Sequence, residues 1–86
     1  MTGKRVREAI VVEGKYDKIK LSSVVDALIL ETHGFRIFKD KELLNLLRRL
    51  AGQRGLLVLT DSDSAGFVIR DYLSGAIPPT QIKHAY

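Results

Sequence analysis

The chain contains no cysteine and no long run of apolar residues. Without cysteine there is no disulfide and no thiolate metal site, which favours a reducing, cytoplasmic setting. No stretch approaches the roughly 18 apolar residues that a membrane-spanning helix requires, so we expect no membrane association. The amino terminus is basic, but the apolar segment after it, residues 9–12, stops at Glu13 and is too short for a secretory signal.

Size and charge set further bounds on the chain. With 86 residues, of which 45% are apolar, we expect one domain with a small core. The formal net charge is +4, and an excess of positive charge favours polyanionic partners through counterion release. The cationic residues are spread along the chain without a single basic arm. Composition alone is therefore a modest indication of a nucleic-acid partner.

Four apolar segments are candidate strands, at residues 9–12, 27–30, 56–60 and 82–86. Residues 15–25 fit either a strand or a helix; we favour a short helix, with Asp17 as a candidate cap, because parallel strands need a crossover. A leucine stripe from Leu43 to Leu50, preceded by Asp40 as N-cap, predicts a second helix, and residues 65–76 predict a third. The result is an alternating βαβαβαβ order.

This order predicts a three-layer α/β/α domain around a mainly parallel four-stranded sheet. Right-handed crossovers would bring the carboxyl ends of all strands to one edge. If the strands are numbered along the chain, a sheet order of 2-1-3-4 would make the first and third strands neighbours.

Carboxylates cluster at the ends of those two strands. Asp61 and Asp63 directly follow the third strand, and Glu13 ends the first, where Gly14 allows a sharp exit at positive φ. Residues i and i+2 of a strand lie about 6.5 Å apart on one face, so two carboxylates at this spacing can share a hard cation. Such charges about 4 Å apart repel by about 4 kcal/mol at an effective dielectric of 20, which a bound cation relieves. The alternative is that both aspartates are ordinary loop and helix-capping residues.

The segments VVEGKYD (residues 11–17) and LVLTDSDSAG (residues 57–66) together resemble the two signature motifs of the Toprim superfamily. Topoisomerases, bacterial primases and a ribonuclease that matures ribosomal RNA share this catalytic domain. Gly66 and Ile69-Arg70 look most like the maturation ribonuclease and its small stand-alone relatives, while the DSAG segment is also similar to the primase form. The resemblance covers residues 7–86.

The resemblance implies a Toprim fold and assigns roles to particular residues. Glu13 would act as general acid or base or as a metal ligand, and Asp61 and Asp63 would hold Mg²⁺, as one or two ions. Alanine occupies position 65, where some relatives carry a third acid, so the number of ions stays open. Residues expected to contact phosphate or nucleic acid are Gly14, Lys15, Gly66 and Arg70.

The expected function is Mg²⁺-dependent cleavage or transfer of phosphodiesters in RNA or DNA, most like an RNA maturation endonuclease. One alternative is a primase-related module that binds metal and nucleic acid but needs another domain or protein for turnover. A phospho-receiver-like signalling domain is a third. The aspartates follow the third strand rather than the first, which argues against the common aspartate phosphatases. We expect a single Toprim domain over residues 1–86, as a fragment or minimal version that lacks a C-terminal domain or a protein partner. His33 and His84 are interpreted as surface residues.

Overall fold

A computed structural model of the protein describes residues 4–60 and 64–85. Its centre is a four-stranded sheet formed by β2 (Ala9–Val12), β4 (Ile29–Glu31), β5 (Leu56–Leu59) and β6 (Ile82–Ala85). The strands are ordered β4-β2-β5-β6 and every pair is parallel. The predicted sheet order is therefore confirmed, and β2 and β5 are neighbours.

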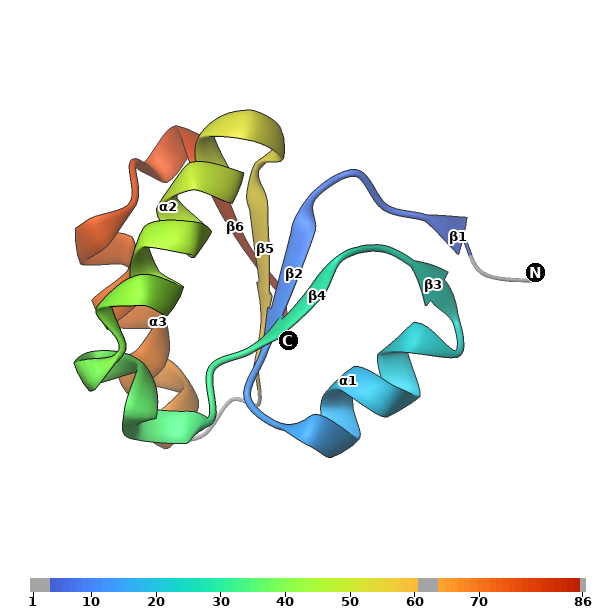
Figure 1. The fold of residues 1–86 in the computed structure, drawn as a ribbon, viewed down its shortest axis with the longest axis horizontal. Helices are drawn as coiled ribbons and strands as arrows, with labels where there is room; N and C mark the ends of the chain where they lie inside the picture. The colour runs from blue at the N-terminus through green and yellow to red at the C-terminus, as the bar shows by residue number, and fades with distance from the viewer. Residues whose placement is uncertain (1–3, 61–63, 86) are drawn as a thin grey trace.

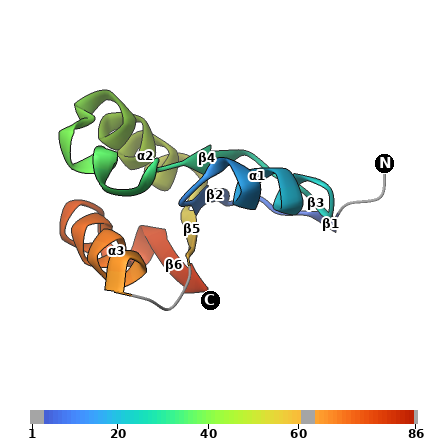
Figure 2. The same cartoon turned by 90° about the horizontal axis from the view of Figure 1, so that it is seen from below.

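Helices cover both faces of this sheet (Figure 1). The helices α2 (Lys41–Arg54) and α3 (Ser64–Ala76) lie side by side on one face, and α1 (Lys15–Ser22) lies on the other. The turned view in Figure 2 shows the same separation into layers. The architecture is thus the three-layer α/β/α arrangement that was predicted, consistent with a Toprim, Rossmann-like fold.

The two faces of the sheet bury separate apolar clusters because neighbouring residues of a strand point to opposite faces. On the α2 and α3 side, Val11, Leu56 and Val58 are fully buried against Leu47 and Leu73. On the α1 side the buried cluster is smaller and consists, among the described residues, of Ile10, Val12 and Ile29. No residue of α1 is buried, so this helix is the more weakly packed layer.

The start of α1 corrects two details of the sequence interpretation. The N-cap residue is Gly14, and Asp17 lies within the first turn of the helix, so the prediction that Asp17 caps it is wrong. Gly14 has φ −141° and ψ 175°, an extended conformation that any residue adopts, so the expected positive φ is also wrong. The chain leaves β2 by an extended residue and enters the helix at Lys15.

The ends of α2 determine how the chain enters β5. Asp40 caps the helix as predicted, since its Oδ1 accepts a hydrogen bond of 2.9 Å from the Leu43 amide. At the other end Gly55 has φ 83° and ψ 159°, a conformation open essentially to glycine alone. The Gly55 carbonyl accepts a 3.1 Å bond from the Ala9 amide. This bond helps to align the start of β2 with the start of β5.

Short elements were absent from the sequence interpretation. The strands β1 (Lys4–Arg5) and β3 (Val25–Asp26) form a small parallel two-stranded sheet, and the 3₁₀ helices η1 (Gly34–Lys39) and η2 (Pro79–Gln81) precede α2 and β6. The second strand of the main sheet also begins later than predicted, at Ile29. Within the described ranges, no helix is long and apolar enough to cross a membrane.

Candidate metal and nucleic-acid site

The carboxyl ends of β2 and β5 lie next to each other at one edge of the sheet. Their register pairs Val11 with Val58. Glu13 and Thr60 each follow these residues by two positions, so both lie at this edge. Asp61 follows Thr60 directly in the sequence, but Asp61 and Asp63 fall outside the described residues. Open α/β sheets bind their ligands at this edge.

Glu13 is half-buried, and its carboxylate oxygen Oε1 is shielded from solvent. Its backbone is held in place, because the Glu13 carbonyl accepts a 3.0 Å hydrogen bond from the His33 amide beyond the end of β4. The backbone of Glu13 is thus fixed at the carboxyl end of β2.

Two threonines on either side of Glu13 were not among the predicted site residues, although Thr32 was expected at this edge of the sheet. Thr32 follows β4 and is 1% exposed, and Thr60 follows β5 and is 6% exposed. Neither hydroxyl has a hydrogen-bond partner among the described residues. An unpaired buried hydroxyl costs about 1–3 kcal/mol, so such groups in native proteins call for an explanation. The available signal was polar residues ending buried strands, a position typical of ligand contacts.

The donor atoms at this edge suit a hard cation. Within residues 4–60 and 64–85, no three Asp, Glu, His or Cys side chains gather as a metal site, and the predicted ligands Asp61 and Asp63 lie outside those ranges. The atoms on hand are oxygens: the Glu13 carboxylate and the orphaned threonine hydroxyls. Oxygen ligands are those that Mg²⁺ takes, so the residues present fit the predicted ion.

The predicted phosphate contacts occupy different environments. Lys15 is exposed as the first residue of α1. A Cβ added at Gly14 would meet no atom within 4 Å, so the backbone there is open to an approaching ligand. Gly66, by contrast, is buried in the first turns of α3.

Arg70 is placed in a way that the sequence did not indicate. Its side chain is 4% exposed and points from α3 to the ends of β5 and β6. The guanidinium donates to the Thr60 carbonyl at 3.0 Å, to the Val58 carbonyl at 3.4 Å and to the Ala85 carbonyl. These contacts are with backbone rather than with an exposed phosphate position.

His84 also contacts Arg70, at 3.0 Å between Nη1 and the imidazole Nδ1. Because a guanidinium can only donate, Nδ1 accepts and the proton of the neutral ring is on Nε2, 3.3 Å from the Ser74 hydroxyl. Burial, together with the positive charge of Arg70, lowers the pKa of His84 below its ordinary value. His84 is therefore a largely exposed residue, as expected, that also makes a part-buried contact with Arg70.

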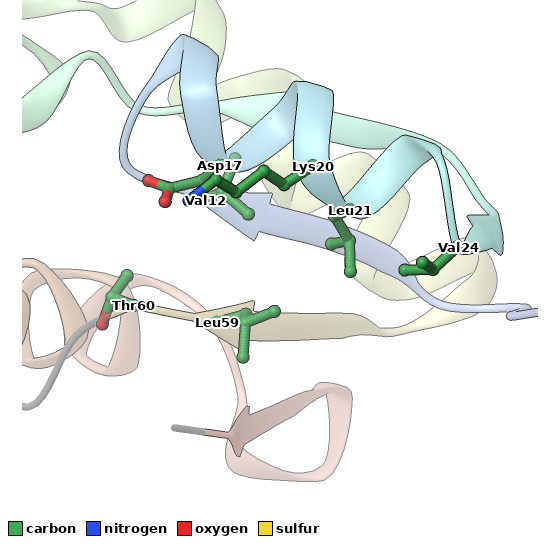
Figure 3. A pocket seen from close by; sticks show the side chains of 7 residues that line it. All are labelled: Val12, Asp17, Lys20, Leu21, Val24, Leu59 and Thr60. Atoms are coloured by element: carbon green, nitrogen blue, oxygen red, sulfur yellow. The ribbon is translucent and has the colours of Figure 1, made fainter.

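A cleft of about 270 Å³ opens beside the strand-end edge, between α1 and β5 (Figure 3). Its apolar walls are Val12, Leu21, Val24 and Leu59, and its polar rim is Asp17, Lys20 and Thr60. In Figure 3, Asp17 and Thr60 face each other across its mouth. The candidate site is therefore open to solvent on the α1 side.

His33 closes the same edge beyond β4. It adopts a left-handed conformation with φ 57°, and its Nδ1 lies 3.6 Å from the Glu31 carboxylate. The side chain is about half exposed, which fits the expected loop histidine.

Comparison with known proteins supports a relationship over nearly the whole chain. The chain is 42% identical over 83 residues to a Ribonuclease M5 of Lactiplantibacillus plantarum, covering 96% of the chain. Over nearly its whole length the chain is therefore similar to part of ribonuclease M5. A Ribonuclease M5 of Borreliella burgdorferi is 36% identical over 83 residues, and one of Bacillus subtilis is 38% identical over 82, each covering 95% of the chain.

This relationship confirms the resemblance drawn from the two motifs. The chain spans less than half the length of these ribonuclease M5 sequences, between 42% and 45%. No family model matches the chain.

Proposed function

We propose that this chain is a Mg²⁺-dependent catalytic domain that cleaves phosphodiester bonds in RNA. The observation that carries the proposal is the meeting of Glu13 with the end of β5, where the sequence continues into Asp61 and Asp63. The relationship to proteins named Ribonuclease M5 supports RNA as the substrate.

Each residue of the edge has a distinct role in this proposal. Asp61 and Asp63 hold Mg²⁺, and Glu13 is either a further ligand or the group that moves a proton at the reacting oxygen. When bound, Mg²⁺ supplies neutralisation of the negative charge that develops on the phosphate. The Thr60 hydroxyl, which is buried and has no partner within residues 4–60 and 64–85, donates to a water or phosphate oxygen.

The substrate would reach the edge along α1. Lys15, Lys18 and Lys20 are all exposed on this helix, together with Tyr16, which is 81% exposed. Lysine neutralises phosphate, and an exposed aromatic ring is a platform on which an unpaired base stacks. Gly14, with open space where a side chain would lie, lets a phosphate approach the backbone at the start of the helix.

The proposal is tested first by titration of the isotope-labelled protein with Mg²⁺, followed by NMR. We expect shifts concentrated near Glu13 and Thr60, which Asp61→Asn abolishes. The matched control is Asp26→Asn, because Asp26 is an exposed carboxylate on β3 and its ion pair with Arg5 is also exposed. No response to millimolar Mg²⁺ would overturn the proposal.

Cleavage of a structured RNA then separates an enzyme from a binding module. We expect Glu13→Gln and Asp61→Asn to reduce cleavage by at least about 100-fold, as loss of a positioned proton-transfer group does, while Asp26→Asn retains it. Metal and RNA binding without cleavage would favour the alternative, a module that needs further polypeptide. The greater length of the ribonuclease M5 relatives is the observation behind that alternative.

A further inference from the structure

Arg70 ties together the ends of two neighbouring strands. Its Nη2 donates to the carbonyls of Thr60, beyond β5, and of Ala85, at the end of β6. Its Nη1 contacts the Val58 carbonyl and the His84 imidazole, one from each strand. The side chain supplies donors between β5 and β6 at the place where the strand pairing of the sheet ends.

The same side chain also connects both flanks of the short segment 61–63. Thr60 precedes this segment and α3 begins directly after it, at Ser64. Arg70 belongs to α3, and its bond to the Thr60 carbonyl spans ten residues of sequence. The bond therefore links α3 to the end of β5.

The choice of arginine has a physical cost that calls for a reason. A guanidinium stays charged at every physiological pH, and moving it out of water is unfavourable unless its donors are satisfied. An apolar side chain would fill the same space between helix and sheet without that cost. Only a planar fork with several donors can bind carbonyls of two strands at once.

We propose that Arg70 is a positioning residue for the metal site, holding the two flanks of the segment that carries Asp61 and Asp63. This inference rests on the proposed function, since it assumes that these aspartates bind Mg²⁺. It replaces the expected role of Arg70 as a direct phosphate contact with one exerted through the Thr60 backbone.

The test compares the Mg²⁺ affinity of Arg70→Met and Arg70→Lys with that of the unaltered chain, by NMR titration under conditions where each is folded. Loss of residues that orient metal ligands typically costs 10–100-fold in metal affinity or activity, and we expect a loss in this range for Arg70→Met. Arg70→Lys keeps the charge but not the fork, so we expect most of the loss to remain. If Arg70→Met does not fold, the Mg²⁺ affinity of Arg70→Lys alone tests the proposal.

Ile69→Val is the matched control. Ile69 is the neighbouring residue of α3, fully buried in the core, and its apolar side chain cannot donate a hydrogen bond to the strand-end carbonyls. It should lower thermal stability while leaving the Mg²⁺ affinity of the folded protein within about twofold, because loss of one buried methylene weakens packing alone. In cleavage assays over a range of RNA concentrations, Arg70→Lys should lower kcat more than it raises KM. Added Mg²⁺ should restore part of the lost kcat.

The possible failures are distinguishable. Equal Mg²⁺ affinity in folded Arg70→Lys and unaltered protein would overturn the role of Arg70 and leave the proposed function standing. Full recovery by Arg70→Lys of an affinity lost in Arg70→Met would show that charge, not the fork, is what matters, and would overturn positioning. An unaltered chain that ignores Mg²⁺ would overturn the proposed function itself.

Discussion

Thr60 combines two features at the level of a single residue. Its carbonyl is held by Arg70, and its hydroxyl is buried without a partner among the described residues. The bond to the carbonyl stabilises the fold, whereas a buried hydroxyl without a partner destabilises it. Proteins retain destabilising residues mainly at functional sites. The buried hydroxyl of Thr60 therefore supports a role in contacting a ligand.

Replacing Thr60 by valine separates these features. Valine keeps the shape and the backbone carbonyl but removes the unpaired hydroxyl. We therefore expect the metal-free protein to gain about 1 kcal/mol or more in its free energy of unfolding. Urea denaturation measures this change, and the nuclease assay should show reduced cleavage by the same variant.

The exposed Thr80 gives the matched control, since Thr80→Val should alter neither stability nor cleavage appreciably. A Thr60→Val protein that is clearly less stable than the unaltered chain would mean that the hydroxyl has a partner in solution. The ligand role would then lose its support.

Among the elements, α2 is the one whose sequence is most consistent with its structure. The leucine stripe buries Leu47 and Leu50 against the sheet, and Asp40 caps the first turn. The helix then ends at Gly55, which leads straight into β5. The chain runs from β5 into the segment with the aspartates. A substitution that shifts α2 would therefore shift β5 as well as weaken the core.

Removing the cap of α2 gives a prediction at this scale. Asp40→Ala loses the 2.9 Å bond to the Leu43 amide and should lower the free energy of unfolding by about 1 kcal/mol. Asp40→Asn retains a capping oxygen and should stay within a few tenths of a kcal/mol of the unaltered chain. Thermal and urea denaturation check both values, and equal effects of the two substitutions would argue against the cap.

The contact of α3 with β6 predicts a dependence of stability on pH. The pKa of His84 is lowered in the fold by burial and by the charge of Arg70, so the unfolded chain binds a proton more readily. The free energy of unfolding should therefore be highest above about pH 6.5 and fall as the pH drops below that value. Urea unfolding at pH 7.5 and 5.5 measures the difference.

His84→Gln should flatten this dependence, because glutamine can accept from Arg70 but does not titrate. Glu8, whose pKa is lowered mainly by its hydrogen bond with Lys83, titrates at more acidic pH and does not enter this window. A slope between pH 7.5 and 5.5 that is the same in both proteins would exclude His84 as its source.

At the scale of the whole molecule, the parallel sheet brings helix starts and strand ends to one edge. Lys15 begins α1 at that edge, directly after β2 and Gly14, whereas Arg54 ends α2 where the chain turns back into β5. The excess of positive charge is spread over the chain, so position relative to this edge decides which cations meet the substrate.

RNA binding should therefore depend on salt in a residue-specific way. If Lys15 contacts a phosphate, Lys15→Gln should reduce the slope of log affinity against log salt by about 0.7–0.9. Arg54→Gln, at the opposite end of the molecule, should leave the slope unchanged. Filter-binding or fluorescence titrations between about 50 and 200 mM salt distinguish the two variants, because a few phosphate contacts change the affinity about tenfold over this range.

Much of the fold could be predicted because the main strands are short apolar segments separated by recognisable helices. The sheet order followed from the requirement that Glu13 meet the aspartates, and the structure confirms it. The two-residue strands β1 and β3 could not be predicted, since they are held by contacts with each other rather than by an apolar pattern. The conformation of Gly14 was predicted wrongly because glycine permits positive φ without requiring it.

What the sequence determined by itself is the chemistry and its order along the chain: carboxylates after two apolar segments, and a pair of motifs that resembles those of the Toprim superfamily. What the tertiary structure alone decided is the role of groups whose partners are distant in sequence. The sequence predicts a phosphate contact for Arg70, whereas the fold buries it and surrounds it with carbonyls at the ends of β5 and β6. Thr32 and Thr60 are buried by packing, and their hydroxyls have no hydrogen-bond partner in the part of the chain that the structure describes. A side chain's charge is local, whereas its burial and its partners belong to the whole fold.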